Sequence, residues 1–205
     1  MALELLVIVI SYLLGSVSFS VLFARLLKGI DIRQYGSGNA GATNTLRVLG
    51  KGPAILVLLL DVLKGIAAVW LGTWAGGWGT WAAVACGLAA IVGHNWPLYF
   101  HFRGGKGIAT TIGVMATLAF WPALIAGIIA ILSIVFTRYV SLGSLIFVAL
   151  TPVFLLFTEY TAPELWGSLI IVLFAFWRHR TNIVKISQGR ENKIGSKAKE
   201  GNRVV

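Results

Sequence analysis

Long apolar runs separated by short polar segments dominate this sequence. Runs of about twenty residues with few or no charges cover 3–23, 53–74 and 80–100, and further apolar stretches follow. Each is long enough to cross the hydrocarbon core of a bilayer as a helix. Only 12% of the 205 residues are charged, about half the share of a soluble domain. Lipid offers no water to backbone polar groups, and the runs do not alternate as barrel strands do. The sequence therefore predicts an all-α integral membrane protein.

The basic residues predict how the chain is oriented in the membrane. Of the 17 Lys and Arg residues, all but Lys64 lie outside the apolar runs, in 25–51, 103–106, 178–203 and at Arg138. Because basic loops stay in the cytoplasm, we expect the N-terminus outside and the C-terminus inside. A net charge of +10 is compatible with nucleic-acid binding. The chain has no nucleic-acid-binding motif, however, so no such partner is predicted. The first run lacks a basic n-region and is read as a retained span.

The apolar run 108–136 decides the number of spans. Its 29 residues would reach about 43 Å as one helix, whereas a hydrocarbon core is about 30 Å thick. A single span would also place the basic C-terminus outside, while a break at Trp121-Pro122 lets every loop obey the positive-inside rule. We therefore predict seven transmembrane helices in a single polytopic domain, 1–205. Residues 196–205 are expected to form a disordered basic tail.

Three polar segments, 36–47, 93–107 and 178–191, fall on the predicted cytoplasmic side. They are rich in Gly, Asn, Lys, Arg and His, whereas the predicted outer loops are short and contain no comparable groups. Their convergence predicts an active site at the cytoplasmic face.

The first polar segment has the composition of an anion-binding loop. Glycines allow backbone N–H groups to point toward one place, and such nests bind anions. Side-chain donors and the Arg47 guanidinium can add to them. The spacing Gly36, Gly38, Gly41 also matches a dinucleotide-binding motif, but that motif needs a preceding strand. A Walker A loop would have lysine where Ala42 stands. The bland alternative, a glycine-rich tight turn, does not explain why Ser37, Asn39, Thr43 and Asn44 share it.

The other two polar segments repeat this chemistry. Gly104, Gly105 and Gly107 surround Lys106 at a predicted helix N-terminus, where amide donors, the helix dipole and a point charge favour an oxyanion. A positive-inside anchor is the bland alternative. In the third segment, His179 and Asn182 are three apart and share a face if the last helix continues. A basic stop-transfer flank would explain Arg178 and Arg180 but not these two residues. His94 fits a structural role as well as a functional one.

Two charged residues lie inside the second apolar run. Asp61 and Lys64 are one helical turn apart, and a charge at mid-bilayer costs at least about 2.5–3.5 kcal/mol, so we expect the two to face the bundle and pair. No metal site is predicted, because the three histidines are dispersed. The lone Cys86, inside an apolar run, excludes a cysteine cluster and is read as a core residue. No cofactor is expected either.

The three polar segments, with Asp61-Val62-Leu63-Lys64-Gly65, resemble the bacterial acyl-phosphate-dependent glycerol-3-phosphate acyltransferases, the PlsY family. The resemblance covers about residues 5–191. It implies a multi-pass enzyme of the bacterial cytoplasmic (inner) membrane. The implied reaction transfers a fatty acyl group from acyl phosphate to the sn-1 hydroxyl of glycerol 3-phosphate. The products are lysophosphatidic acid and phosphate, in the first acylation step of phospholipid biosynthesis. A monomer is compatible with this assignment.

Physical reasoning assigns roles within this reaction. Two phosphate groups must lie close together, so several cations must neutralise them. The predicted catalytic residues are Ser37, Arg47, Lys106, His179 and Asn182. The predicted substrate-binding residues are Gly36, Gly38, Asn39, Gly41, Thr43, Asn44, Gly104, Gly105 and Gly107, and the supporting residues are Asp61, Lys64 and His94. Because phosphate can itself accept a proton, we expect catalysis by positioning and charge. The competing classes are an organic-anion transporter, which would need a matching outer gate, and a lipid-binding scaffold.

Overall fold

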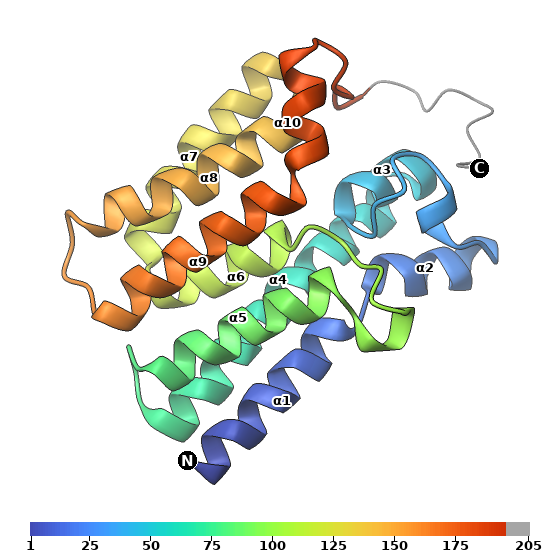
Figure 1. Ribbon diagram of the computed structural model, residues 1–205. Coiled ribbons are helices and arrows are strands. Elements are labelled where there is room, and N and C mark those ends of the chain that lie inside the picture. Colours follow the sequence, from blue (N-terminus) through green and yellow to red (C-terminus); the bar gives the residue numbers. More distant parts are fainter. Residues whose placement is uncertain (196–205) are drawn as a thin grey trace.

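The computed structural model describes residues 1–195, and the prediction of a disordered tail at 196–205 lies outside them. Within the described residues the chain forms ten α-helices and two 3₁₀ turns. Figure 1 shows α1 (Ala2–Ser16), α4 (Lys51–Gly76) and α5 (Trp81–Asn95) packed side by side. The short helices α3 (Ala42–Leu49) and α10 (Arg180–Ser187) lie toward the end of the molecule away from the N-terminus.

The predicted first span, 3–23, is not a single helix. It divides into α1 and α2 (Phe19–Lys28), with Val17 and Ser18 in extended backbone between them. The cause is tertiary: outside a helix, the Val17 carbonyl accepts a hydrogen bond from Lys64 Nζ at 2.9 Å. A buried ammonium needs this acceptor, and the Gly15-Ser16 pair directly before the break favours a bend there.

The run 108–136 divides into two helices, as predicted, but the break comes earlier than Trp121-Pro122. Helix α6 (Ile108–Leu118) ends at Ala119, whose φ of −144° and ψ of 67° are not helical, and α7 (Phe120–Thr137) follows. Pro122 therefore lies in the first turn of α7. Proline is tolerated there, because backbone N–H groups in the first turn have no acceptor within the helix. The chain then returns as α8 (Val140–Leu155) and α9 (Ala162–Arg178).

Close packing of α4 on α6 depends on glycine. A Cβ at Gly65 would collide with the Thr110 carbonyl oxygen, and one at Gly113 with the Val62 carbonyl oxygen. Small residues let helix backbones approach closely in membranes, where burial of apolar surface gives little driving force. Helix α9 begins with a capping box between Thr161 and Glu164, which fixes its start.

Four segments are long and apolar enough to cross a membrane: Ala2–Lys28, Lys51–Gly76, Trp81–Phe100 and Phe120–Thr137. Two shorter apolar helices, Ile108–Leu118 and Val140–Leu155, accompany them. The all-helical membrane architecture agrees with the sequence, and no strand occurs in residues 1–195. The count of seven spans and their orientation stay predictions.

Candidate functional site

The glycine loop before α3 is shaped by a buried asparagine. Gly36 and Gly38 have φ of 62° and 72°, a left-handed conformation that glycine adopts without strain. The Asn44 side chain is fully buried and accepts the Ser37 N–H at 2.8 Å. It also donates to the Ile32 and Tyr35 carbonyls at 3.2 and 3.0 Å. Asn44 therefore holds the loop from inside, which leaves the Ser37 hydroxyl exposed.

The second loop is fixed from two sides. The Arg178 guanidinium donates to the Gly105 carbonyl at 2.6 Å and lies 5.3 Å from the centre of the Trp96 ring. Arg33, in the 3₁₀ turn Ile32–Gln34 just before the first polar segment, donates to the Phe100 carbonyl at 2.8 Å. Arginine suits the binding of loop carbonyls, because its planar guanidinium stays charged and can donate to several oxygens at once. The segment 98–107 is thus tied to both the 3₁₀ turn Ile32–Gln34 and α9.

A chain of hydrogen bonds joins Lys106 to three other elements. Lys106 Nζ donates to Asn182 Oδ1 at 2.5 Å, and Asn182 Nδ2 donates to Glu191 Oε1 at 2.8 Å. The Ser141 hydroxyl donates to the same carboxylate oxygen at 3.0 Å. Burial lowers the pKa of Lys106 to about 8; the charge of Glu191 opposes the shift and that of Arg178 adds to it. The ammonium is thus held in place but titrates close to neutral pH.

His179 lies at the junction of α9 and α10, where the helix is interrupted. Only 2% of its surface is exposed. Its Nδ1 lies 2.8 Å from the Ala175 carbonyl oxygen, and because a carbonyl only accepts, Nδ1 carries the proton and Nε2 the lone pair. Burial, and then the charge of Lys106, lower the pKa of His179 to about 4. The imidazole is therefore neutral at pH 7 and can accept a hydrogen bond through Nε2.

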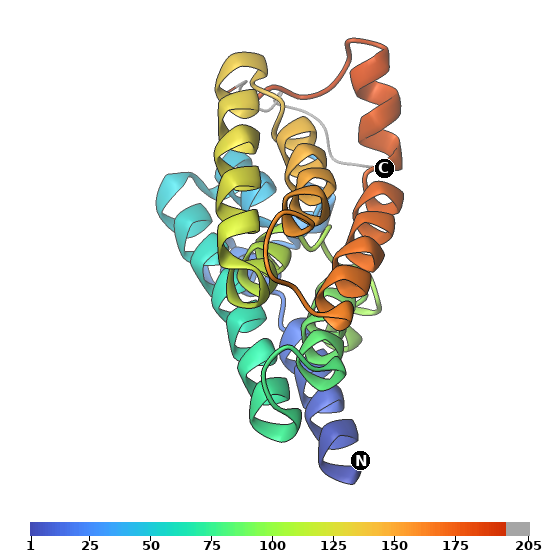
Figure 2. The ribbon, with the colours of Figure 1, turned by 90° about the vertical axis from the view of Figure 1, so that its left-hand side faces the viewer.

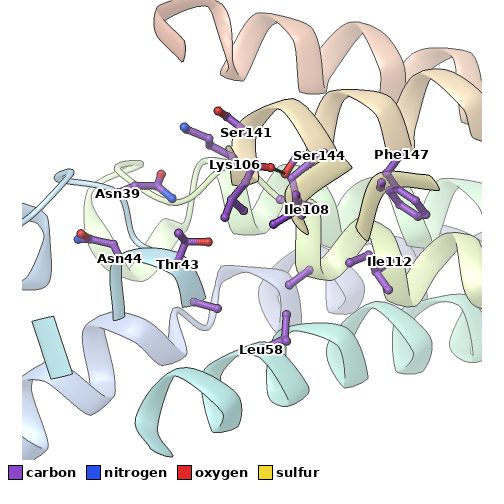
Figure 3. Close-up of a pocket in the computed structure, with 18 of the residues that line it drawn as sticks. Asn39, Thr43, Asn44, Leu58, Lys106, Ile108, Ile112, Ser141, Ser144 and Phe147 are labelled. Atoms are coloured by element: carbon purple, nitrogen blue, oxygen red, sulfur yellow. Dashed lines mark hydrogen bonds between the residues drawn. The ribbon is translucent and has the colours of Figure 1, made fainter. Parts of the chain in front are cut away.

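Asn44, Lys106, Arg178, His179 and Asn182 all line one cavity of about 1020 Å³. Its polar end is lined by Ser37, Arg47, Lys106, His179 and Asn182, and burial lowers the pKa of Arg47. From there an apolar groove continues between α4 and α6 on one side and α7 and α8 on the other. Figure 3 shows Asn39, Thr43 and Lys106 at one part of the pocket and Leu58, Ile112 and Phe147 farther along it.

The groove has walls that are open to the surroundings. Ile55 on α4 and Ile131 on α7 both line it and are 56% and 62% exposed. In a membrane protein, exposed apolar side chains on spanning helices face lipid. A molecule with an apolar tail can therefore reach the polar end from the bilayer.

Asp61, Lys64 and His94 form a buried charged cluster beside the cavity. Lys64 Nζ lies 2.7 Å from Asp61 Oδ1 and 3.0 Å from His94 Nδ1, so the predicted ion pair is present. Asp61 and His94 line the cavity, while Lys64 does not. No three His, Cys, Asp or Glu side chains within residues 1–195 are grouped to hold a metal ion.

The model of the glycerol-3-phosphate acyltransferase family matches residues 5–189. The chain belongs to this family. The glycerol-3-phosphate acyltransferase of Shouchella clausii is 57% identical over 195 residues, 93% of this chain and 95% of its own. That of Halalkalibacterium halodurans is 55% identical over 202 residues, covering 96% and 98%.

Solved structures of a relative support the same family. PlsY (YgiH), an integral membrane glycerol 3-phosphate acyltransferase, matches with TM-scores of 0.90 in its glycerol 3-phosphate form and 0.87 in its lysophosphatidic acid form. Each match has 37% identity and covers 94% of this chain and 96% of the relative. The protein is therefore an acyltransferase of the PlsY family.

In this acyltransferase the five predicted catalytic residues all line the cavity. Of the predicted binding and supporting residues, only Gly36, Gly105 and Lys64 do not line it. Gly36 shapes the turn, and a Cβ at this position would collide with Asn44 Oδ1. The Gly105 N–H donates to the His94 carbonyl at 3.1 Å, so it is not available to an anion.

Several lining residues received no role from the sequence, among them Ser141, Ser144, Lys185 and Glu191. Ser141 and Ser144 are three apart on an otherwise apolar helix, a polar face that can be found in the sequence. Lys185 is three residues from Asn182 and shares its face of α10 by the same rule. Glu191 had no comparable signal, because its partners Asn182 and Ser141 are brought together only by the fold.

Proposed function

We propose that this enzyme transfers a fatty acyl group from acyl phosphate to the sn-1 hydroxyl of glycerol 3-phosphate, giving lysophosphatidic acid and phosphate. The observation that carries the proposal is one cavity with a cationic end and an apolar groove, because both substrates are anionic and one has an acyl chain. The glycerol 3-phosphate and lysophosphatidic acid forms of the related PlsY (YgiH) support the same acceptor and product here.

The two principal cations are assigned to the phosphate of the acceptor. Arg47 and Lys106 bind the phosphate of the acceptor, with His179 and Asn182 completing its shell. The Ser37 hydroxyl holds the phosphate of the donor. The N–H groups of Ser37, Gly38 and Gly41 already donate to acceptors within the loop. Each phosphate approaches −2 at neutral pH, and the charges of Lys51, Arg178 and Lys185 along the same cavity help to neutralise the pair.

The leaving phosphate takes the proton of the attacking hydroxyl. A general base works best with a pKa near the operating pH, and the pKa of His179 in the ligand-free site is about 4. Phosphate, with a second pKa near 6, is the stronger base and is bonded to the carbon under attack. The protein contributes by placing the hydroxyl against the acyl carbon and by stabilising the oxyanion that forms.

The acyl chain lies in the groove and stays continuous with the bilayer. Phe120 and Ile134, both on α7, line the cavity, and fourteen helical residues rise about 21 Å. One leaflet of the hydrocarbon core is about 15 Å thick. The groove thus fits an acyl chain of ordinary length, and each buried CH₂ contributes about 0.8 kcal/mol.

We further propose that the whole chain, 1–205, is one polytopic domain of the bacterial cytoplasmic membrane, with seven spans and the active site on the cytoplasmic side. The polar segments that carry the cations are then on the side where soluble glycerol 3-phosphate is present. No protein partner is required, since every group named above belongs to one chain.

Purified protein in detergent, mixed with acyl phosphate and labelled glycerol 3-phosphate, tests the proposal. We expect labelled lysophosphatidic acid without a membrane gradient and none when acyl-CoA replaces acyl phosphate. Glu159→Gln, which changes an exposed carboxylate on the α8–α9 loop, serves as the unaltered control. Product formation from acyl-CoA alone would refute the donor, and glycerol phosphate flux into vesicles without acylation would favour a transporter.

A further inference from the structure

The segment after α10 crosses the polar end of the cavity. Figure 2 shows it leaving the top of α10 and running to the turn between α7 and α8. Its end is fixed there, because the Ile194 N–H donates to the Arg138 carbonyl at 2.8 Å and the Arg138 guanidinium donates to the Ile194 carbonyl at 2.9 Å. Its start is fixed by the Arg190 N–H, which donates to the Lys185 carbonyl at 2.7 Å. Glu191 is thereby held beside the cavity that it lines.

Only one of the two oxygens of the Glu191 carboxylate accepts hydrogen bonds from the described residues. Oε1 accepts hydrogen bonds from Asn182 and Ser141, whereas Oε2 is shielded from solvent and has no partner among the described residues. Burying an acceptor that has no hydrogen-bond donor costs free energy, and one explanation for such a group is a ligand that binds there. The other carboxylate lining the cavity, Asp61, already has Lys64 and His94 beside it.

The chemistry of the acceptor supplies the donor that Oε2 lacks. Glycerol 3-phosphate has a phosphate, the hydroxyl that is acylated and a second hydroxyl on the middle carbon. Glu191 repels the phosphate, which Arg47 and Lys106 attract, so a hydroxyl is the part of the acceptor that can approach the carboxylate. A hydroxyl donates readily to a charged oxygen, and such bonds are stronger than neutral ones.

We propose that Glu191 Oε2 accepts a hydrogen bond from the middle hydroxyl of the acceptor and so selects acceptors that have this hydroxyl. The inference rests on the proposed function. Because Oε1 remains bonded to Asn182, which in turn holds Lys106, the same carboxylate aligns the hydroxyl end and the phosphate end of one acceptor. Sites built to bond a substrate hydroxyl reject analogues that lack it, since a buried polar group is then left unpaired.

The test compares glycerol 3-phosphate with 3-hydroxypropyl phosphate, which keeps the phosphate and the reacting hydroxyl but lacks the middle one. We expect wild-type protein to favour glycerol 3-phosphate about a hundredfold in kcat/KM. Glu191→Gln keeps the shape of the side chain and an oxygen for Asn182 and Ser141. It should lower kcat/KM for glycerol 3-phosphate about tenfold or more while changing that for 3-hydroxypropyl phosphate less than about threefold. If turnover of the analogue is too slow, its inhibition constant serves instead.

The possible outcomes separate the two proposals. Equal losses with both acceptors would overturn the inference, because a carboxylate that only anchors the segment, or acts as a base, affects both alike. Unchanged preference in Glu191→Gln would overturn it as well. Glu159→Gln is the matched control for loss of one carboxylate. If the wild-type protein acylates neither acceptor from acyl phosphate, the proposed function fails, whatever the variants do.

Discussion

Lys106 gives the most quantitative test of the site, because its charge should control acceptor binding within an accessible pH range. Its Nζ is partly buried and donates to Asn182, and burial lowers its pKa to about 8 in the ligand-free protein. Below that pH the ammonium is charged and attracts the acceptor phosphate; above it the charge is lost. Since kcat/KM reports the free enzyme, kcat/KM for glycerol 3-phosphate should fall as pH rises through about 8, approaching tenfold per pH unit.

Two variants separate Lys106 from other titrating groups. Lys106→Arg keeps a positive charge above pH 10, so the fall near pH 8 should disappear. Lys106→Ala should cost about 3 kcal/mol at pH 7, about a hundredfold in turnover, and leave a flat profile. Lys28→Arg is the matched control, because Lys28 is exposed and donates to a backbone carbonyl, that of Val48.

The assay measures labelled lysophosphatidic acid at fixed acyl phosphate between pH 6.5 and 9.5, with spontaneous hydrolysis of the donor subtracted. The acceptor phosphate, with a second pKa of about 6, stays mainly dianionic over most of this range. A fall near pH 8 that persists unchanged in Lys106→Arg would show that another group titrates. Near-normal activity of Lys106→Ala would remove this lysine from the site altogether.

Three further predictions concern other parts of the cavity. Arg47→Ala should lower turnover about a hundredfold with the thermal midpoint little changed; near-normal turnover would exclude Arg47 from phosphate binding. His179→Gln keeps a hydrogen-bond acceptor without basicity, so activity within about tenfold of wild type supports the binding role, whereas complete loss with unchanged acceptor KM would identify a general base. A Cβ at Gly127 would meet no atom within 4 Å, and Gly127 lines the groove. Gly127→Leu should therefore lower kcat/KM for long-chain acyl phosphates about tenfold and leave kcat/KM for short-chain ones unchanged. Equal losses for all chain lengths would refute the placement of the acyl chain beside Gly127.

The helical membrane fold follows from features that act locally along the chain. The predicted run 53–74 corresponds to α4, Lys51–Gly76, because lipid forces a long apolar run to bond within itself. Charge placement predicts that the run 108–136 divides but not where. The predicted position, Trp121-Pro122, was wrong by two residues, because Pro122 lies in the first turn of α7 rather than at the break. The break between α1 and α2 has only a weak local signal, the Gly15-Ser16 pair, and it is stabilised by Lys64 from a neighbouring helix.

Residue types predicted the chemistry of the site but not which groups perform it. The sequence placed Asn44 among the ligand-binding residues, and its amide is fully engaged with the loop backbone. Arg178 was explained as a flank of the last span, yet it fixes the carbonyl of Gly105 from across the bundle. The role of Arg178 depends on a contact between residues 73 positions apart, which spacing along the chain cannot reveal. The role of Asn44 depends on a loop conformation that brings residues 7 to 12 positions apart into contact.

The cations of this site fall into two groups with different physical roles. Arg33 and Arg178 donate to loop carbonyls, so they hold the shape of the polar end before any substrate arrives. Arg47 has no hydrogen-bond partner among the described residues, and Lys106 has a single side-chain acceptor. Their remaining donors have lost water to burial without gaining partners, which is why the pKa of each is lowered. Binding of a phosphate dianion relieves that cost at both residues, so the same burial that weakens these charges in the ligand-free protein strengthens their attraction for the substrate.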